Sequence, residues 1–194
     1  MAKRKKPKKG KTKERIAKQV KKIESFKALF VGGRVFSVEA EAKQLYEKTS
    51  FGELGEDKIN YSLVEALYLL EKKTIKIYAG KRLLNYDSFL KKACKLEPNF
   101  LTKFIVFKDM RNRGYIVKTA LKFGADFRVY DKGIKPGQDH AKWILYPVAE
   151  GSTLTWHEFA AKNRVAHSTR KRLLIAIVDD ESDVTYYEIS WKRP

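Results

Sequence analysis

Three histidines, His140, His157 and His167, carry the imidazole that proteins use for acid–base chemistry and for binding metals. None belongs to an H-E-x-x-H motif, and no other ligand spacing of a zinc enzyme is present. A single cysteine, Cys94, excludes an internal disulfide and a cysteine-rich zinc site. We expect Cys94 to be a small core residue on a helix. The sequence therefore predicts no zinc centre.

Other common reaction centres are also missing from the sequence. It has no glycine-rich loop of the kind that binds a mononucleotide or a dinucleotide. Metal-dependent nucleases use clustered carboxylates near a lysine, and we interpret the two short matches, Glu41-Ala42-Lys43 and Glu71-Lys72-Lys73, as chance. The acidic run at residues 179–183 has the composition of a cation site, but such runs are more often exposed turns or docking surfaces. We expect no metal ion and no other cofactor.

Positive charge is the strongest compositional signal. Lys and Arg number 42 against 23 Asp and Glu, which gives a formal net charge of +19. Residues 1–22 contain 12 Lys or Arg and one Glu, and the rest of the chain is basic as well. Such a chain favours a polyanionic partner, because its cations release the counterions condensed on phosphates. The alternative is a tail that serves only solubility, and we favour nucleic acid over it.

A nucleic-acid partner leaves one chemistry that needs no metal. An RNA strand carries its own nucleophile, the 2′-hydroxyl, and cleavage then requires a base, an acid for the leaving 5′-oxygen and a cation beside the charge on phosphorus. Histidine and lysine suit the roles of acid and cation, and tyrosine can act as the base where a nearby cation lowers its pKa. His140 follows the Gly-, Pro- and Asp-rich residues 133–139, at a loop-to-strand junction. This is a better catalytic position than the helical sites of His157 and His167, which we interpret as structural residues or RNA contacts.

The elements that must position these residues fall into three parts. We expect a mobile basic tail over residues 1–22, an N-terminal α/β domain over residues 23–97 and a second domain over residues 98–194, divided at the helix-breaking Pro98. No run of about 18 apolar residues predicts a membrane span. No apolar run follows the first basic residues, as it would in a secretory signal. We expect a cytoplasmic protein.

The first domain is predicted to begin with a β-hairpin. An apolar run at residues 26–31 and an alternating segment at residues 34–38 flank the turn signal Gly32-Gly33. The sequence Ser62-Leu63-Val64-Glu65 is a capping box, in which the hydroxyl and the carboxylate bind free backbone N–H groups, and it predicts a helix over residues 63–72. The other expected elements are a helix at residues 40–48, a strand at 74–78 and a helix at 87–96.

The second domain is predicted to be a mixed sheet flanked by helices. A second capping box, Thr155-Trp156-His157-Glu158, starts a helix that runs to about residue 167. The continuous apolar run at residues 173–179 is typical of a strand buried on both faces. The acidic turn then leads to a last strand. The other expected elements are a helix at residues 100–113 and strands at 115–119, 126–130, 143–148 and 184–191.

Two long blocks of sequence resemble the archaeal tRNA-splicing endonucleases. The first runs from Phe107-Lys108-Asp109-Met110-Arg111-Asn112-Arg113-Gly114-Tyr115 through the Gly-Ala-Asp-Phe segment to residue 130, and the second is Arg164-Val165-Ala166-His167-Ser168 followed by Arg170-Lys171. The similarity covers roughly residues 98–194, and the first half resembles the family's N-terminal domain more loosely. The resemblance implies an α/β (α+β) fold with a small N-terminal domain and a C-terminal nuclease domain.

The family resemblance also implies the roles of particular residues. Tyr130 matches the family's general base for the 2′-hydroxyl, His140 its general acid and Lys171 the cation that stabilises the transition state. All three are present, whereas non-catalytic subunits of the same family lack them. Arg164 matches a residue that contacts bulged RNA. The acidic residues between the last two strands match a loop that docks into a partner subunit; they are Asp179, Asp180, Glu181 and Asp183.

The reaction implied by the resemblance is metal-independent cutting of a precursor tRNA at both splice sites of a bulge-helix-bulge motif. It leaves a 2′,3′-cyclic phosphate and a 5′-hydroxyl. Two cuts at a fixed separation require two active sites, so we expect an assembly with twofold symmetry. A homotetramer is favoured because one chain carries both the triad and the acidic loop, and an (αβ)2 assembly with a structural subunit stays open.

Two other functions remain as alternatives. The chain would be a non-catalytic, RNA-binding structural subunit of the same assembly if it cut RNA only with a second chain present. It would be a metal-dependent DNA nuclease if cleavage required magnesium and tolerated a missing 2′-hydroxyl. The sequence favours the metal-independent endoribonuclease over both.

Overall fold

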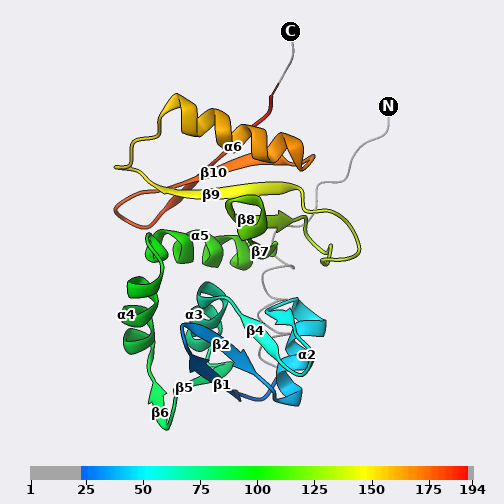
Figure 1. The fold of residues 1–194 in the computed structure, drawn as a ribbon, viewed down its shortest axis with the longest axis vertical. Helices are drawn as coiled ribbons and strands as arrows, with labels where there is room; N and C mark the ends of the chain where they lie inside the picture. The colour runs from blue at the N-terminus through cyan, green and yellow to red at the C-terminus, as the bar shows by residue number, and fades with distance from the viewer. Residues whose placement is uncertain (1–22, 192–194) are drawn as a thin grey trace.

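The computed structural model describes residues 23–191, and the tail predicted at residues 1–22 lies outside that range (Figure 1). The strands of the first half form a six-stranded sheet in the order β3-β4-β2-β1-β5-β6, in which β1 and β5 are parallel. Helices α2, α3 and α4 belong to the same half. The elements are β1 (Phe26–Val31), β2 (Arg34–Ser37), α2 (Ala40–Thr49), β3 (Glu53–Leu54), β4 (Ile59–Tyr61), α3 (Leu63–Glu71), β5 (Ile75–Ala79), β6 (Arg82–Leu84) and α4 (Tyr86–Leu96).

The second half contains a five-stranded sheet in the order β11-β10-β9-β8-β7. Strands β9 and β10 are parallel and the other neighbours are antiparallel, so the sheet is mixed. Figure 1 shows α5 below this sheet and α6 above it. The elements are α5 (Phe100–Asn112), β7 (Ile116–Ala120), a 3₁₀ turn η1 (Leu121–Phe123), β8 (Ala125–Tyr130), β9 (Trp143–Ala149), α6 (Trp156–Ser168), β10 (Arg172–Val178) and β11 (Val184–Ile189).

Every helix and strand that the sequence predicted in residues 26–191 is present, within two residues at each end. Both capping boxes are formed, at Ser62 and Thr155. The fold class, an α/β (α+β) chain with an N-terminal half and a C-terminal half built on a mixed sheet, is confirmed. Three short strands, β3, β4 and β6, were not predicted. The predicted domain boundary at Pro98 falls between α4 and α5 and stays a prediction.

The prediction for Cys94 is wrong, because its side chain is exposed on α4. The buried residues of this helix are Phe89 and Ala93, four positions apart and therefore on one face. Cys94 follows Ala93 directly and is rotated away from that face.

None of the helices in residues 23–191 is long and apolar enough to cross a membrane.

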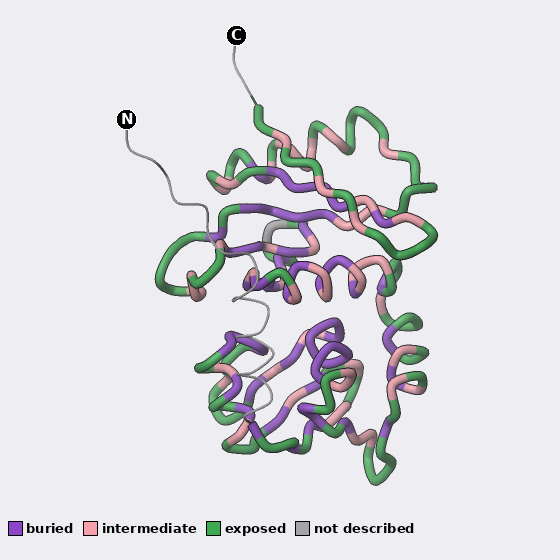
Figure 2. The backbone as a smooth tube through the Cα atoms, turned by 180° about the vertical axis from the view of Figure 1, so that it is seen from behind, coloured by how far each residue is buried: buried purple, intermediate pink, exposed green. Residues whose placement is uncertain are grey.

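Strand β10 is buried on both faces, as its continuous apolar sequence predicted. Its side chains alternate between two clusters: Leu174 and Ala176 join the large core on one face of the sheet, and Leu173 and Ile175 join a smaller cluster on the other. The smaller cluster includes Ala166 of α6. Figure 2 shows this arrangement: the residues along the central strands are buried, and those along the outer helix, α6, are mostly exposed. The middle of the sheet is therefore covered on both faces, and the ends of its strands extend beyond the covered part.

The large apolar core is continuous across both halves of the molecule. Helix α5 lies between the second sheet and α3, and its Phe107 ring contacts aromatic rings from both sides. The ring centroids of Phe107 lie 6.4 Å from Phe51, 6.0 Å from Tyr68 and 6.0 Å from Phe127. Packing of this kind makes the first half a support for the second half.

A buried ion pair connects the two halves beside this core. The carboxylate of Glu65, in α3, accepts a hydrogen bond from the ammonium of Lys118, in β7, at 3.1 Å, and each side chain is only 5% exposed. Lys118 also donates to the carbonyl of Gly52, and Glu65 accepts from the backbone N–H groups of Gly52 and Ser62 at 3.0 and 3.1 Å. Burial alone would raise the pKa of Glu65, but Lys118 and these hydrogen bonds outweigh it and lower the pKa. Every charge in this network is therefore compensated.

Arg111, in α5, makes a second polar contact between the halves. Its guanidinium lies 3.6 Å from the centroid of the Phe51 ring and donates to the carbonyl of Thr49 at 3.0 Å. Burial lowers the pKa of Arg111 to about 10, so the group stays charged at neutral pH. The segment between α2 and β3 is thus bound by two cations of the second half.

Removal of one member of the buried pair is expected to destabilise the protein strongly. Lys118→Met leaves the Glu65 carboxylate buried without its cation, which should lower the free energy of unfolding by about 3–5 kcal/mol. Denaturant unfolding at pH 7 measures this effect. The double variant Glu65→Gln/Lys118→Met removes both charges and should be more stable than Lys118→Met alone.

Lys76→Met, at an exposed position of β5, is the matched control and should change stability by no more than about 0.5 kcal/mol. Because the pKa of Glu65 is lower in the folded state, its contribution is present above the unfolded value of about 4.3 and is lost as the pH falls. Glu65→Gln should flatten this acid limb. A Lys118→Met variant as stable as Lys76→Met would contradict the structural role of the pair.

Candidate active site

Three strand ends meet at one edge of the second sheet, and each carries a residue singled out by the sequence. Tyr130 is the last residue of β8, His140 lies in the loop before β9, and Lys171 directly precedes β10. Strand β8 is antiparallel to β9, so the end of β8 lies beside the start of β9. Strand β10 is parallel to β9, so the starts of these two strands are adjacent. The topology therefore brings together residues that are far apart in the sequence.

The pairing register fixes this meeting point at Trp143. Trp143 pairs with Val129 of β8 on one side and with Arg172 of β10 on the other. Two backbone hydrogen bonds extend the pairing beyond the start of β9: the Lys142 N–H donates to the carbonyl of Val129 at 2.8 Å, and the Arg172 N–H donates to the carbonyl of Lys142 at 3.0 Å. Backbone hydrogen bonds between β8, β9 and β10 therefore continue as far as the residues that line the site.

The loop that carries His140 is held by local turns. Gly133 and Gly137 have φ values of 85° and 94°, in the region that glycine adopts without a steric penalty. The backbone N–H of His140 donates to the carboxylate of Asp139 at 2.6 Å. The ammonium of Lys135 reaches the carbonyl of Glu47 in α2 at 2.7 Å, which connects this loop to the first half of the molecule.

Lys171 is placed by the turn that ends α6. The N–H of Lys171 donates to the carbonyl of Ala166 at 2.8 Å, and the N–H of Arg170 donates to the carbonyl of His167 at 2.9 Å. This pair of hydrogen bonds is the Schellman motif, with Arg170 in the left-handed conformation at a φ of 54°. The Lys171 ammonium donates to the carbonyl of Thr169 at 2.8 Å. The chain direction therefore changes at a defined angle just before Lys171.

Tyr130, His140 and Lys171 line one pocket of about 360 Å³. The Tyr130 ring is 5% exposed and packs with Ile116 and Ala141, Lys171 is half-buried, and His140 is exposed. Partial burial and the nearby Arg128 guanidinium lower the pKa of Lys171. The pocket thus combines a phenol, an imidazole and an ammonium, which can serve as the base, the acid and the cation in metal-independent RNA cleavage.

Arg128 lines the same pocket and was not predicted from the sequence. It lies two residues before Tyr130 in β8, and alternate residues of a strand share one face of the sheet. This spacing was the available signal, because any residue on that face near the strand end borders the site. Gly137, Gln138, Asp139 and Ala141 complete the lining.

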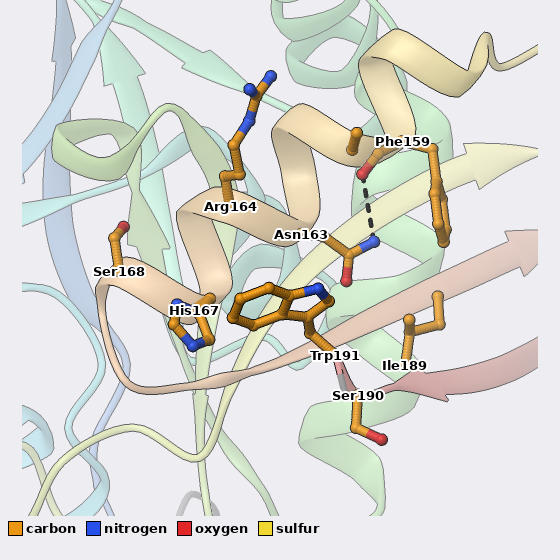
Figure 3. Close-up of a pocket in the computed structure, with 9 residues that line it drawn as sticks. Phe159, Asn163, Arg164, His167, Ser168, Ile189, Ser190 and Trp191 are labelled. Atoms are coloured by element: carbon orange, nitrogen blue, oxygen red, sulfur yellow. Dashed lines mark hydrogen bonds between the residues drawn. The ribbon is translucent and has the colours of Figure 1, made fainter. Parts of the chain in front are cut away.

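Arg164 lies outside this pocket. It is exposed on α6 and borders a separate, mainly apolar pocket of about 650 Å³ between that helix and the end of β11 (Figure 3). Its guanidinium extends away from the indole of Trp191, whose ring lies 4.5 Å from that of His167. His157, in the first turn of α6, is also exposed and lines neither of these pockets. Contact of Arg164 with RNA stays a prediction.

The acidic residues form the turn between β10 and β11, as the sequence predicted. The Asp179 carboxylate accepts from the N–H of Asp183 at 2.8 Å, and Ser182 has a φ of 69°. Asp180, Glu181 and Asp183 are exposed. Within residues 23–191, no three His, Cys, Asp or Glu side chains come together to hold a metal ion. The turn therefore presents free carboxylates at the surface, and its role in assembly stays a prediction.

The chain is similar to known proteins over both halves. Residues 100–186 match the family model of the tRNA intron endonuclease catalytic C-terminal domain, and residues 26–90 match that of the tRNA intron endonuclease N-terminal domain. The tRNA-splicing endonuclease of Nanoarchaeum equitans is 47% identical over 138 residues, which are 68% of this chain and 88% of the relative. That of Thermococcus gammatolerans is 42% identical over 163 residues, 84% of this chain and 95% of the relative. That of Methanothermobacter thermautotrophicus is 37% identical over 166 residues, with coverage of 84% and 96%.

The lowered pKa of Lys171 can be measured directly. In protein labelled with ¹³C at the lysine ε-carbon, the Lys171 resonance should titrate below the ordinary lysine value of about 10.4. Arg128→Gln removes a neighbouring positive charge and should move that midpoint upward. A Lys171 midpoint that is the same in both proteins would show that the two cations do not interact.

Proposed function

The chain belongs to the tRNA intron endonuclease family, and from this we propose that it is an endoribonuclease that excises introns from precursor tRNA. The relatives named above carry the name tRNA-splicing endonuclease and align over most of their length. One observation of this structure carries the proposal: Tyr130, His140 and Lys171 reach a single pocket from three different strand ends. A subunit that had lost its catalytic role would have no reason to keep all three.

We propose that the reaction is an attack of the RNA's own ribose. The Tyr130 oxygen, as general base, removes the proton from the 2′-hydroxyl, and the 2′-oxygen forms a bond to phosphorus. The bond from phosphorus to the 5′-oxygen breaks, and the His140 imidazolium donates a proton to that oxygen. The Lys171 ammonium stabilises the negative charge on the non-bridging oxygens. The products are a 2′,3′-cyclic phosphate and a 5′-hydroxyl, and no metal ion takes part.

The substrate is proposed to be the bulge-helix-bulge motif of a precursor tRNA. The exposed loop of His140 and the ends of strands β8, β9 and β10 are accessible to an unstacked RNA strand. An intact A-form helix, in contrast, hides its base edges in a deep groove. Arg164 is proposed to contact the bulged nucleotides. It lies on the helix whose terminal turn places Lys171, so the RNA contact and the reaction share one element.

The proposal predicts cleavage in EDTA. The wild-type protein, incubated with a bulge-helix-bulge RNA and excess EDTA, should make two cuts, because the nucleophile is supplied by the substrate. Gel analysis should show fragments with cyclic phosphate and 5′-hydroxyl ends. The same RNA with 2′-deoxyribose at both cut positions should stay intact. His140→Ala should slow single-turnover cleavage by about 10²–10⁴-fold with little change in RNA affinity.

His157→Ala is the control for the histidine variant, because His157 is exposed on α6 and does not line the pocket. It should cut at the wild-type rate. Cleavage that requires magnesium or accepts the deoxy substrate would favour a metal-dependent nuclease. RNA binding without cleavage, with activity gained only on addition of a second chain, would favour the non-catalytic subunit.

We further propose that the protein acts as a homotetramer, with (αβ)2 as the alternative. The exposed carboxylates of the β10–β11 turn are proposed to dock on a basic surface of a second subunit. The Asp179 carboxylate is engaged in its own turn by a hydrogen bond from the backbone N–H of Asp183, so the exposed carboxylates of Asp180, Glu181 and Asp183 are the ones available to a partner. Charge attraction of this kind also sets the relative orientation of subunits.

The assembly predicts a mass that depends on the acidic turn. Light scattering of the wild-type protein should give four times the monomer mass. Asp180→Asn/Glu181→Gln removes two charges without touching the turn's hydrogen bond and should shift the protein to smaller species. The control Glu56→Gln/Asp57→Asn removes the same charge from another exposed loop and should stay tetrameric. A wild-type monomer, or equal masses for the two variants, would contradict the docking role.

A further inference from the structure

Arg128 lies in the active-site pocket, and the surroundings of its side chain favour the binding of an anion. Its side chain is half-buried, it lines the pocket with Tyr130, His140 and Lys171, and its guanidinium carbon lies 5.9 Å from the centroid of the Tyr130 ring. The Nε atom is buried and has no hydrogen-bond partner among the described residues. A buried donor without an acceptor costs free energy, and the cost is larger when the group is charged.

The cations around Arg128 make its position more unfavourable. Lys171 lies close enough for Arg128 to lower its pKa, so the two positive charges repel one another. Lys118 is the direct partner of Arg128 in the β7–β8 register, but Glu65 neutralises that ammonium. Within residues 23–191, no carboxylate forms an ion pair with Arg128. The described protein therefore neutralises Lys118 and leaves the charge of Arg128 facing the pocket.

A purely structural role does not explain these contacts. A cation–π contact with Tyr130 at 5.9 Å is near the limit at which such contacts contribute, and it leaves the Nε donor unsatisfied. The buried Nε of Arg111 also lacks a partner, but the Arg111 guanidinium donates to the carbonyl of Thr49, whereas the Arg128 side chain makes no hydrogen bond among the described residues. A phosphate oxygen supplies both the negative charge and the acceptor that Arg128 lacks.

We propose that Arg128 is a fourth substrate-contacting residue of this site, whose guanidinium binds a non-bridging oxygen of the scissile phosphate beside Lys171. The inference rests on the proposed function and assigns a role to a residue beyond the base, the acid and the lysine. Arg128 holds the phosphate from the Tyr130 side of the pocket, and Lys171 approaches it from the start of β10. Two cations on one phosphate stabilise the additional charge that develops when the 2′-oxygen attacks.

The test compares Arg128→Gln with Arg172→Gln in single-turnover cleavage at saturating RNA. Arg172 follows Lys171, lies outside the pocket and pairs with Glu188 at 2.7 Å, so its removal measures the general effect of one lost charge. Arg128→Gln should reduce the rate by about 10²–10³-fold, and Arg172→Gln by no more than a few-fold. Arg128→Lys, which keeps the charge and loses the planar fork, should fall between wild type and Arg128→Gln.

Sulfur substitution of the scissile phosphate locates the contact. RNAs in which sulfur replaces one or the other non-bridging oxygen are cleaved separately by wild type and by Arg128→Gln. For the oxygen that Arg128 binds, sulfur should slow the wild type by a larger factor than it slows the variant, because the variant has already lost that contact. Equal rates for Arg128→Gln and Arg172→Gln, or equal sulfur effects in wild type and variant at both oxygens, would overturn the proposal.

A binding measurement separates this inference from the proposed function. RNA with 2′-deoxyribose at the cut positions binds without reacting, and its dissociation constant should rise more in Arg128→Gln than in Arg172→Gln. A wild-type protein that leaves normal RNA uncut would refute the endonuclease, and the deoxy RNA would still report on the phosphate contact. Equal affinities of the two variants for deoxy RNA would refute the contact of Arg128 with phosphate. Thermal unfolding confirms that each variant is folded at the assay temperature.

Discussion

The parallel pairing of β9 with β10 is the constraint on which the site depends. If β10 ran antiparallel to β9, Lys171 would lie at the opposite edge of the sheet from Tyr130 and His140. Parallel neighbours need a long crossover, and α6 supplies it while covering one face of the sheet. The Schellman turn at the end of that helix then sets the position of Lys171. One connection thus provides the cover of the sheet, the helix that carries Arg164 and the turn that positions Lys171, which is why these features occur together in the sequence.

The first half of the chain acts on the site through packing and through buried charge. Strand β7 is the neighbour of β8, and Lys118 in β7 is held by Glu65 and by the backbone of Gly52. This ion pair fixes the strand opposite Arg128, while the contact of Lys135 with α2 holds the loop before His140. These two contacts support two different sides of the pocket, although no residue of the first half lines it. The first half therefore supports the site through fixed contacts, and this support requires no movement between the halves.

The sequence predicted the parts of this structure that local physics determines. The capping boxes at Ser62 and Thr155, the hairpin around Gly32 and the two-sided burial of β10 follow from nearby residues or from a simple period. The short strands β3, β4 and β6 have two or three residues each, too few for a period to show. They form by pairing: β4 pairs with β2, β3 with β4, and β6 with β5. The misplaced Cys94 has the same origin, because composition predicts burial without specifying the face of the helix.

The residues of the candidate site also fall into those that the local sequence indicated and those that it did not. His140 was indicated by its loop, whereas Tyr130 and Lys171 were indicated only by resemblance, since a single tyrosine or lysine in a basic chain has no distinctive pattern. Arg128 was missed because its distinguishing property, a charge without a carboxylate partner among residues 23–191, exists only after the chain has folded. The proposed phosphate contact would offset the cost of this charge, because a phosphate oxygen supplies the acceptor that the buried Nε of Arg128 lacks among the described residues.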